Sequence, residues 1–162
     1  MNQDLFIFLH ALSKAFNGKS DIARGIIKEF NCIDEIFKTD IKTLQEELRL
    51  SYNIAKRLTD KSLLLEAERD ILWSESENID IIDIFSEEYP GRLRELNNAP
   101  LLLFSRGKCN LNANRVFAVV GTRGASKYGE KYCNEIIERL SNCSPKPIII
   151  SGLADGIDTF AH

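Results

Sequence analysis

The sequence predicts an α/β protein in two parts, a small helical domain over residues 1–78 and the first part of a parallel-sheet domain over residues 79–162. Three observations lead to this prediction. Apolar residues recur at helical spacing in the first half, a strand–helix–strand pattern occupies the end of the chain, and the two glycine-rich loops "GTRGAS" and "SGLADGID" each follow a strand of that pattern.

The helical half contains three expected helix starts. Ser20, Thr39 and Ser51 are expected N-caps, respectively of "DIARGIIKEF", of "DIKTLQEEL" and of a longer helix that reaches about Ser76. Short helices joined by tight connections are similar to SAM-like and helix-hairpin-helix modules. The glycine-containing hairpin of a helix-hairpin-helix is missing, since "LRLSYN" occupies its place. DNA binding by this half is therefore not indicated, and an acidic protein-contacting bundle and a purely structural one both stay open.

The second half changes to strand patterns after Asn78, which we expect to end the last helix. Pro90 is expected in the first turn of a short helix, where its missing N–H has no consequence. The expected strands are "IDIIDIF", "PLLLF", "RVFAVV" and "IIIS", and "SKYGEKYCNEIIERL" between the last two is an expected helix. Continuous apolar strands joined by a helix are typical of a parallel sheet covered on both faces, so we expect the last two strands to be buried.

Charge divides unevenly along the chain, whose net charge is -3. Residues 1–88 hold 11 Lys and Arg against 18 Asp and Glu, whereas residues 89–162 hold 10 against 6, so the two parts carry -7 and +4. This asymmetry indicates an anionic partner for the C-terminal part.

Composition limits the class of protein and its compartment. The 162 residues contain no apolar run of roughly 18 residues and no basic, cleavable leader, so we expect a cytoplasmic protein without a membrane partner. The four cysteines form no C-x-x-C pair, and only two histidines accompany them. We therefore expect free thiols, no metal site and no cofactor.

The two glycine-rich loops are the candidate functional site. Because parallel strands end at one edge of the sheet, both loops should line the same crevice. Glycines there allow backbone N–H groups to approach an anion, and the following helix N-termini add partial positive charge. Arg123 offers a planar guanidinium, and Lys127 and Lys131 offer point charges. The pattern indicates phosphate binding.

The motif does not identify which phosphate is bound. Position 123 is arginine where a dinucleotide-binding G-x-G-x-x-G has its second glycine, and "GASKYGEK" misplaces the lysine of a P-loop and puts Tyr132 where Ser or Thr belongs. An ordinary strand–helix turn also remains possible for either loop.

Three motifs resemble, in order and spacing, those of the DNA-processing protein A family, also called Smf: "YPGRLRELNNAPLLLFSRG", "VVGTRGASKYG" and "ISGLADGIDTFAH". The resemblance implies an extended Rossmann-like domain that binds single-stranded DNA without sequence preference, often as a dimer. It implies assistance in loading the RecA recombinase during natural transformation and recombination, and no enzymatic activity.

The resemblance also implies site residues. It assigns the phosphate-gripping role to Arg123, and the expected DNA-phosphate-binding set is Gly121, Thr122, Arg123, Gly124, Ser126, Lys127, Tyr128, Gly129, Lys131, Ser151, Gly152, Gly156 and Asp158. Asp155 departs from the family, which often has a basic residue there. The family domain continues past "GIDTFAH", so we expect this chain to be a truncated, N-terminal portion.

Other functional readings use the same region. Asp158 and His162 are four residues apart and could form an acid–base pair, but no nucleophile accompanies them, so we expect Asp158 to cap its helix or orient the second loop. Tyr128 could stack on a base, and Tyr132 is expected to pack in the core. The alternative functions are a nucleotide-binding or nucleoside-monophosphate N-glycosidase enzyme on a related fold and a structural adaptor.

Overall fold

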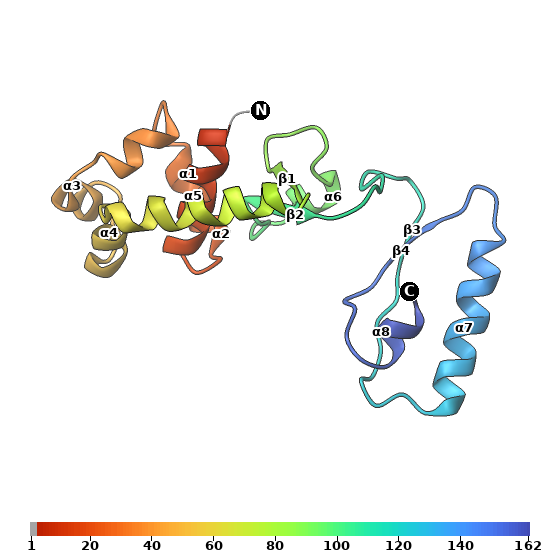
Figure 1. Ribbon diagram of the computed structural model, residues 1–162. Helices are drawn as coiled ribbons and strands as arrows, with labels where there is room; N and C mark the ends of the chain where they lie inside the picture. The colour runs from red at the N-terminus through yellow and green to blue at the C-terminus, as the bar shows by residue number, and fades with distance from the viewer. Residues whose placement is uncertain (1–2) are drawn as a thin grey trace. The chain divides into compact units, whose positions relative to one another are not determined.

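The computed structural model describes residues 3–162, which form two compact units, residues 3–112 and residues 113–162 (Figure 1). We call these the first unit and the second unit. The division differs from the predicted boundary between residues 78 and 79, because the first two strands belong with the helices. Within the described residues, every helix is too short or too polar to cross a membrane.

The first unit begins with a bundle of five α-helices and one 3-10 helix. They are α1 (Gln3–Ala15), α2 (Ser20–Ile27), η1 (Ile33–Phe37), α3 (Ile41–Glu46), α4 (Tyr52–Leu58) and α5 (Lys61–Ser76). Leu9, Leu12, Ile36, Leu44 and Ile71 are fully buried among them and form part of a continuous apolar core. These helices agree with the predicted helical half.

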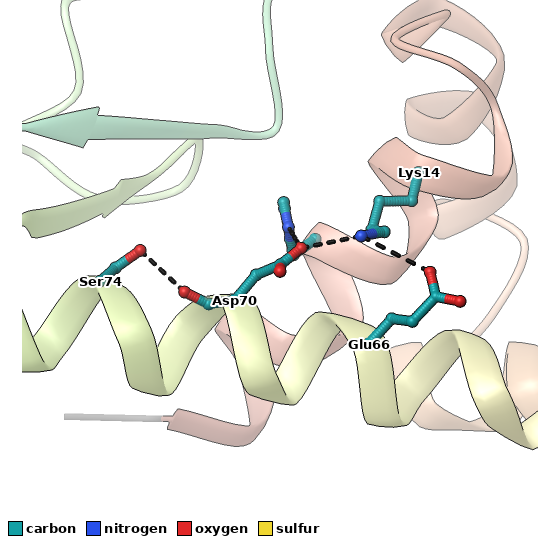
Figure 2. Close-up of polar contacts among 5 residues, drawn as sticks. Lys14, Glu66, Asp70 and Ser74 are labelled. Atoms are coloured by element: carbon teal, nitrogen blue, oxygen red, sulfur yellow. Dashed lines mark hydrogen bonds and ion pairs between the residues drawn. The ribbon is translucent and has the colours of Figure 1, made fainter.

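Helices α1 and α5 run antiparallel, because partners later on α1 lie earlier on α5. Lys14 Nζ lies 2.8 Å from Asp70 Oδ2 and 3.6 Å from Glu66 Oε2, and Figure 2 shows Lys14 between the two carboxylates. His10 Nε2 lies 2.9 Å from the same Asp70 oxygen. Lys14, with a smaller effect of His10, holds the pKa of Asp70 below its usual range. Polar contacts thus fix the register of the apolar contact between the two helices.

The sheet of the first unit packs against its helices. β1 (Asp80–Asp83) pairs antiparallel with β2 (Leu102–Ser105), and the short α6 (Gly91–Arg94) lies between them in sequence. The His10 ring on α1 meets the ring of Phe104 on β2 edge-on, with centroids 5.5 Å apart. Tyr89 is buried and donates a hydrogen bond to the carbonyl of Pro100. This shared core explains why the unit extends to residue 112.

Two of the three predicted caps differ from the observed ones, whereas Ser51 is the N-cap of α4, as predicted. Lys19 precedes α2, and the hydroxyl of Ser20, inside the helix, donates to the Gly18 carbonyl. Asp40 rather than Thr39 caps α3, by accepting from the Thr43 N–H. The helix expected from Ser51 to Ser76 is two helices, because Asp60 accepts the Ser62 N–H and so starts α5 as a separate helix.

The end of α5 is as predicted. Asn78 adopts φ 55°, and the N–H of Ile79 bonds to the Ser74 carbonyl, which closes the helix before β1. Gly91 begins α6 directly after Pro90, which occupies the N-cap position rather than the first turn.

The second unit is a strand–helix–strand unit followed by one short helix. It contains β3 (Val116–Ala118), α7 (Lys127–Ser141), β4 (Ile148–Ile150) and α8 (Ile157–Phe160). β3 and β4 are parallel, with Val116 opposite Ile148 and Ala118 opposite Ile150, as the sequence predicted. Figure 1 shows α7 running beside the two strands that it connects.

The prediction that these two strands are buried is wrong for the described chain. Phe117 is 44% exposed and Ile150 is 53% exposed, and among the described residues of this unit only Cys133, Asp158 and Ala161 are buried. A two-stranded sheet with one long helix has too few apolar elements to cover both of its faces.

Candidate nucleic-acid interface

The two glycine-rich loops of the second unit interlock through glycine. Gly156 has φ 87°, and a Cβ at this position would lie 2.2 Å from the Thr122 carbonyl oxygen. A Cβ at Gly121 would lie 2.5 Å from the Ile157 side chain, and the Ile157 N–H donates to the Thr122 carbonyl over 3.2 Å. Only glycine permits this approach of backbone to backbone. The contact between the two loops is consistent with the prediction that they share one site.

Asp158 joins the two loops and is 6% exposed. Its Oδ1 accepts the Gly121 N–H over 3.2 Å, and its Oδ2 accepts the Gly152 N–H over 3.1 Å. These two backbone donors, which the sequence suggested for a phosphate, are thus used internally. Asp158 orients the second loop, as one of the sequence-based readings expected, and also the first.

The free donors of the site lie at the start of α7. Ser126 is the N-cap, since its hydroxyl oxygen accepts the Gly129 N–H over 3.2 Å and its carbonyl accepts the Glu130 N–H. The earlier first-turn N–H groups, those of Lys127 and Tyr128, have no partner among the described residues. A 15-residue helix adds partial positive charge at this end.

Two cations lie next to these free donors. Arg123 is exposed, as is Lys127 at the first helical position, and neither side chain forms an ion pair with the described residues. Between them, the Gly124 N–H donates to the Thr122 hydroxyl over 3.2 Å, which folds the loop tightly. Lys131 is less available, because its Nζ lies 3.9 Å from Glu135 Oε1. Arg123 and Lys127 are thus the strongest candidates for holding an anion.

Two tyrosines extend along α7 from this point. Tyr128 is 70% exposed and Tyr132 is 45% exposed, with ring centroids 4.3 Å apart. The prediction that Tyr132 packs in the core is wrong, because the described elements of this unit do not cover that face of α7. Hydrogen bonding to Tyr132 raises the pKa of Tyr128 above its ordinary value.

The second loop carries a strained residue and an unsatisfied one. Leu153 adopts φ 54°, a conformation unfavourable for a bulky side chain, and is 70% exposed. The hydroxyl of Ser151 is buried and has no hydrogen-bond partner among the described residues. Strained backbone and orphaned polar groups occur preferentially at functional sites.

The positive charge of this interface is local. The second unit holds six Lys and Arg and five Asp and Glu, a net charge of +1, whereas residues 89–162 carry +4. The difference of three arises because four cations, Arg92, Arg94, Arg106 and Lys108, and one acidic residue, Glu95, belong to the first unit. Binding of an anion must therefore depend on the few cations near the loops.

Other chemistry finds little support here. The carboxylate of Asp158 is held by two amide donors, and His162 is exposed, so the suggested acid–base pair does not form. The described residues contain no group of three His, Cys, Asp or Glu side chains that could hold a metal. All four cysteines are free thiols.

The sequence reasoning missed two residues of the site. Ile157 fills the space left by Gly121 and by Gly129, and a Cβ added at Gly129 would lie 3.4 Å from the Ile157 Cδ1. Cys133, buried on α7, contacts the Ile157 carbonyl with its Sγ at 3.6 Å. The glycines of the two loops were the available signal, because a glycine can allow a neighbouring group to approach the backbone closely.

Residues 80–162, just over half of the chain, match the family described as DNA recombination-mediator protein A. The chain belongs to this family. The DNA processing protein DprA of Streptococcus pneumoniae is 41% identical over 91 residues, which make up 56% of this chain and 31% of the relative. DprA of Bacillus subtilis is 34% identical over 87 residues, covering 53% and 29%.

Protein Smf of Escherichia coli is 37% identical over 95 residues, which cover 59% of this chain and 25% of that protein. The matched part of this chain thus spans less than a third of each of these three relatives. An X-ray structure of the Streptococcus pneumoniae protein aligns with 31% identity and a TM-score of 0.47, over 78% of this chain and 47% of that one.

Proposed function

We propose that the second unit binds the backbone of single-stranded DNA without sequence preference. The observation that carries the proposal is the placement of exposed Arg123 and Lys127 at the free N-terminus of α7, on a loop locked by Gly156 and Asp158. A rigid loop with cations and free N–H groups suits a phosphate, which carries no sequence information.

The proposed binding combines phosphate contact at the loop with base stacking on α7. Arg123, Lys127 and the first N–H groups of α7 contact a phosphate, and the contact between the two loops holds these groups in place. The exposed Tyr128 offers an aromatic face to a base, which any base can use for stacking. Gly121, Gly152, Gly156 and Asp158 act as positioning residues and do not touch the DNA.

The wider role follows from family membership. The relatives are named DNA processing proteins, and the family description is recombination mediation. We infer that this chain acts in DNA processing during transformation and recombination, in the cytoplasm and as a binding protein rather than an enzyme. Loading of the RecA recombinase and homodimer formation are proposed for the protein on the same basis.

The test is the binding of fluorescent oligo-dT, followed by anisotropy, to the Arg123→Ala and Arg139→Ala variants. Arg139 is the matched control, because it is an exposed arginine in the last turn of α7, far from the N-terminus of that helix. Loss of Arg123 should cost about 1–3 kcal/mol of affinity, equally for all sequences, and should reduce the salt dependence by roughly one phosphate contact. Arg123→Lys should restore part of the binding.

The outcome that contradicts the proposal is equal weakening by both substitutions at unchanged melting temperature. In that case general surface charge explains the binding. A parallel titration with AMP, monitored for base release, distinguishes the alternative of a nucleoside-monophosphate N-glycosidase. Saturable release of adenine that Arg123→Ala abolishes would favour the enzyme.

A further inference from the structure

The first unit contains an open groove of about 1100 Å³ along β1. Four consecutive residues, Ile79 to Ile82, line it, whereas β2 contributes only Ser105. A face of a strand would present alternate residues, so a run of four indicates an edge. Residues 107–112, Glu87 and Glu88 also line the groove.

The edge of β1 that lies in this groove has hydrogen-bonding groups to offer. The Ile84 N–H donates to the Leu101 carbonyl, so the antiparallel alternation directs Ile82 and Asp80 towards β2 and Ile81 outwards. Among the described residues, no strand pairs with this outer edge. The N–H and carbonyl of Ile81 are therefore positioned to pair with an added strand.

The 107–112 part of the lining is joined by hydrogen bonds to the residues around Pro90. Asn112 donates from Nδ2 to the carbonyls of Glu87 and Tyr89, over 3.3 and 3.2 Å, and its Oδ1 accepts the Gly91 N–H over 2.8 Å. One side chain thus ties the 107–112 loop to the α6 region. Hydrogen bonds that hold the lining in place lower the entropic cost of filling the groove.

The charge of the groove selects its occupant. Its lining contains four carboxylates, from Glu75, Asp80, Glu87 and Glu88, and one cation, from Lys108. The last three of these acidic residues are exposed. A nucleic acid would be repelled, and the volume exceeds the ~300–1,000 Å³ of typical small-molecule sites. An extended segment with basic side chains complements both the backbone edge and the charge.

We propose that this groove binds an extended, lysine- or arginine-rich peptide segment of a partner protein by adding it to β1 as a further strand. Backbone pairing with Ile81 supplies the geometry, and the carboxylates supply the preference for basic side chains. The site lies wholly in the first unit, so it is independent of the proposed DNA binding by the second.

The probe is a fluorescein-labelled, end-capped peptide of about seven residues that alternates lysine with threonine, titrated against the whole chain at low salt. Binding should be saturable and weaken as salt rises, and the matching glutamate–threonine peptide should not bind. Glu87→Lys with Glu88→Lys should weaken binding by about three- to tenfold.

The matched control is Glu46→Lys with Glu47→Lys, which makes the same charge change at two exposed, adjacent positions outside the groove. It should leave peptide affinity within about twofold, which is the range of a distant surface charge. Circular dichroism of both double variants checks that they fold.

Strand addition itself is tested by N-methylation of the peptide at alternate residues. A strand pairs through one edge only, so methylating one alternate set should abolish binding and methylating the other set should spare it. Equal behaviour of the two methylated peptides, equal loss in both double variants, or no binding up to millimolar peptide would overturn the proposal. So would self-association of the chain that Glu87→Lys with Glu88→Lys abolishes, because the occupant would then be a second copy.

Discussion

The two units of this chain achieve order in different ways. The first unit is held by a continuous apolar core that includes Leu9, Leu12 and Ile71. The second has three buried residues among those described, and its most specific contacts are backbone approaches at Gly156 and the hydrogen bonds of Asp158. Apolar burial thus stabilises one unit, whereas close polar geometry defines the loops of the other.

Truncation of an apolar side chain should give the largest difference in stability loss between the two units. Leu12→Ala is expected to destabilise the first unit by about 3–5 kcal/mol, because Leu12 is fully buried and the cavity cannot collapse. Ile150→Ala in the second unit should cost less than about 1 kcal/mol, since Ile150 is 53% exposed. Urea unfolding followed by circular dichroism measures both. Similar losses would show that the units do not differ in this way.

The second unit, which tolerates loss of an apolar side chain, should be sensitive to substitution of a glycine in its loops. Gly156→Ala is expected to cost about 2–4 kcal/mol and to abolish oligo-dT binding, because the new Cβ meets the Thr122 carbonyl and φ is positive. Gly124→Ala is the control, since its Cβ would have no neighbour within 4 Å and its φ is not positive. DNA binding by anisotropy and thermal unfolding are the two measurements. Unchanged binding in Gly156→Ala would show that the interlocked loops are not needed.

The sequence predicted local features of both units well. The strand–helix–strand order and the helix end at Asn78 follow from neighbouring residues, so a single sequence is sufficient to recognise them. It failed where a local choice had competitors, as at Asp60, whose side chain starts a new helix inside a continuous helical pattern. The burial of Tyr132 and of the last strands depends on elements distant in the chain, which periodicity does not report.

The sequence pointed to the two loops of the candidate site, but it did not reveal the hydrogen bonds that join them. Glycines and cations identified both loops, and the resemblance pointed to Arg123. The double role of Asp158, which bonds to Gly121 37 positions earlier and to Gly152 six positions earlier, follows only from the folded geometry. Its carboxylate accepts the Gly121 and Gly152 N–H groups, which the sequence analysis had expected to bind phosphate.

Charge reversal at Asp155 tests whether charge beside the two loops of the second unit controls DNA affinity. Asp155 is exposed and directly precedes Gly156, which lies against the carbonyls of Thr122 and Arg123. Asp155→Lys should tighten oligo-dT binding by about three- to tenfold at low salt by replacing repulsion with attraction. Glu138→Lys, exposed towards the other end of α7, makes the same change as a control. If both variants tighten binding equally, the effect comes from net charge and not from the loop.

The loss of stability at low pH that Asp70 causes should be the smallest of the predicted effects, and it should affect the first unit. Lys14 lowers the pKa of Asp70, so this carboxylate contributes stability above the unfolded-state pKa of about 3.9, and the contribution is lost as pH falls through the lower folded value. Asp70 is 46% exposed, which limits the effect to below about 1 kcal/mol.

Asp70→Asn should therefore lower the melting temperature slightly at pH 6 and flatten its decline below pH 4. Glu68→Gln, exposed on the same helix without an ion pair to the described residues, should leave the wild-type pH profile in place. Thermal unfolding between pH 2.5 and 6 measures the profiles. If Asp70→Asn keeps the wild-type slope in acid, other carboxylates cause the acid sensitivity, and the contact of Lys14 with Asp70 sets the register of α1 and α5 without stabilising them.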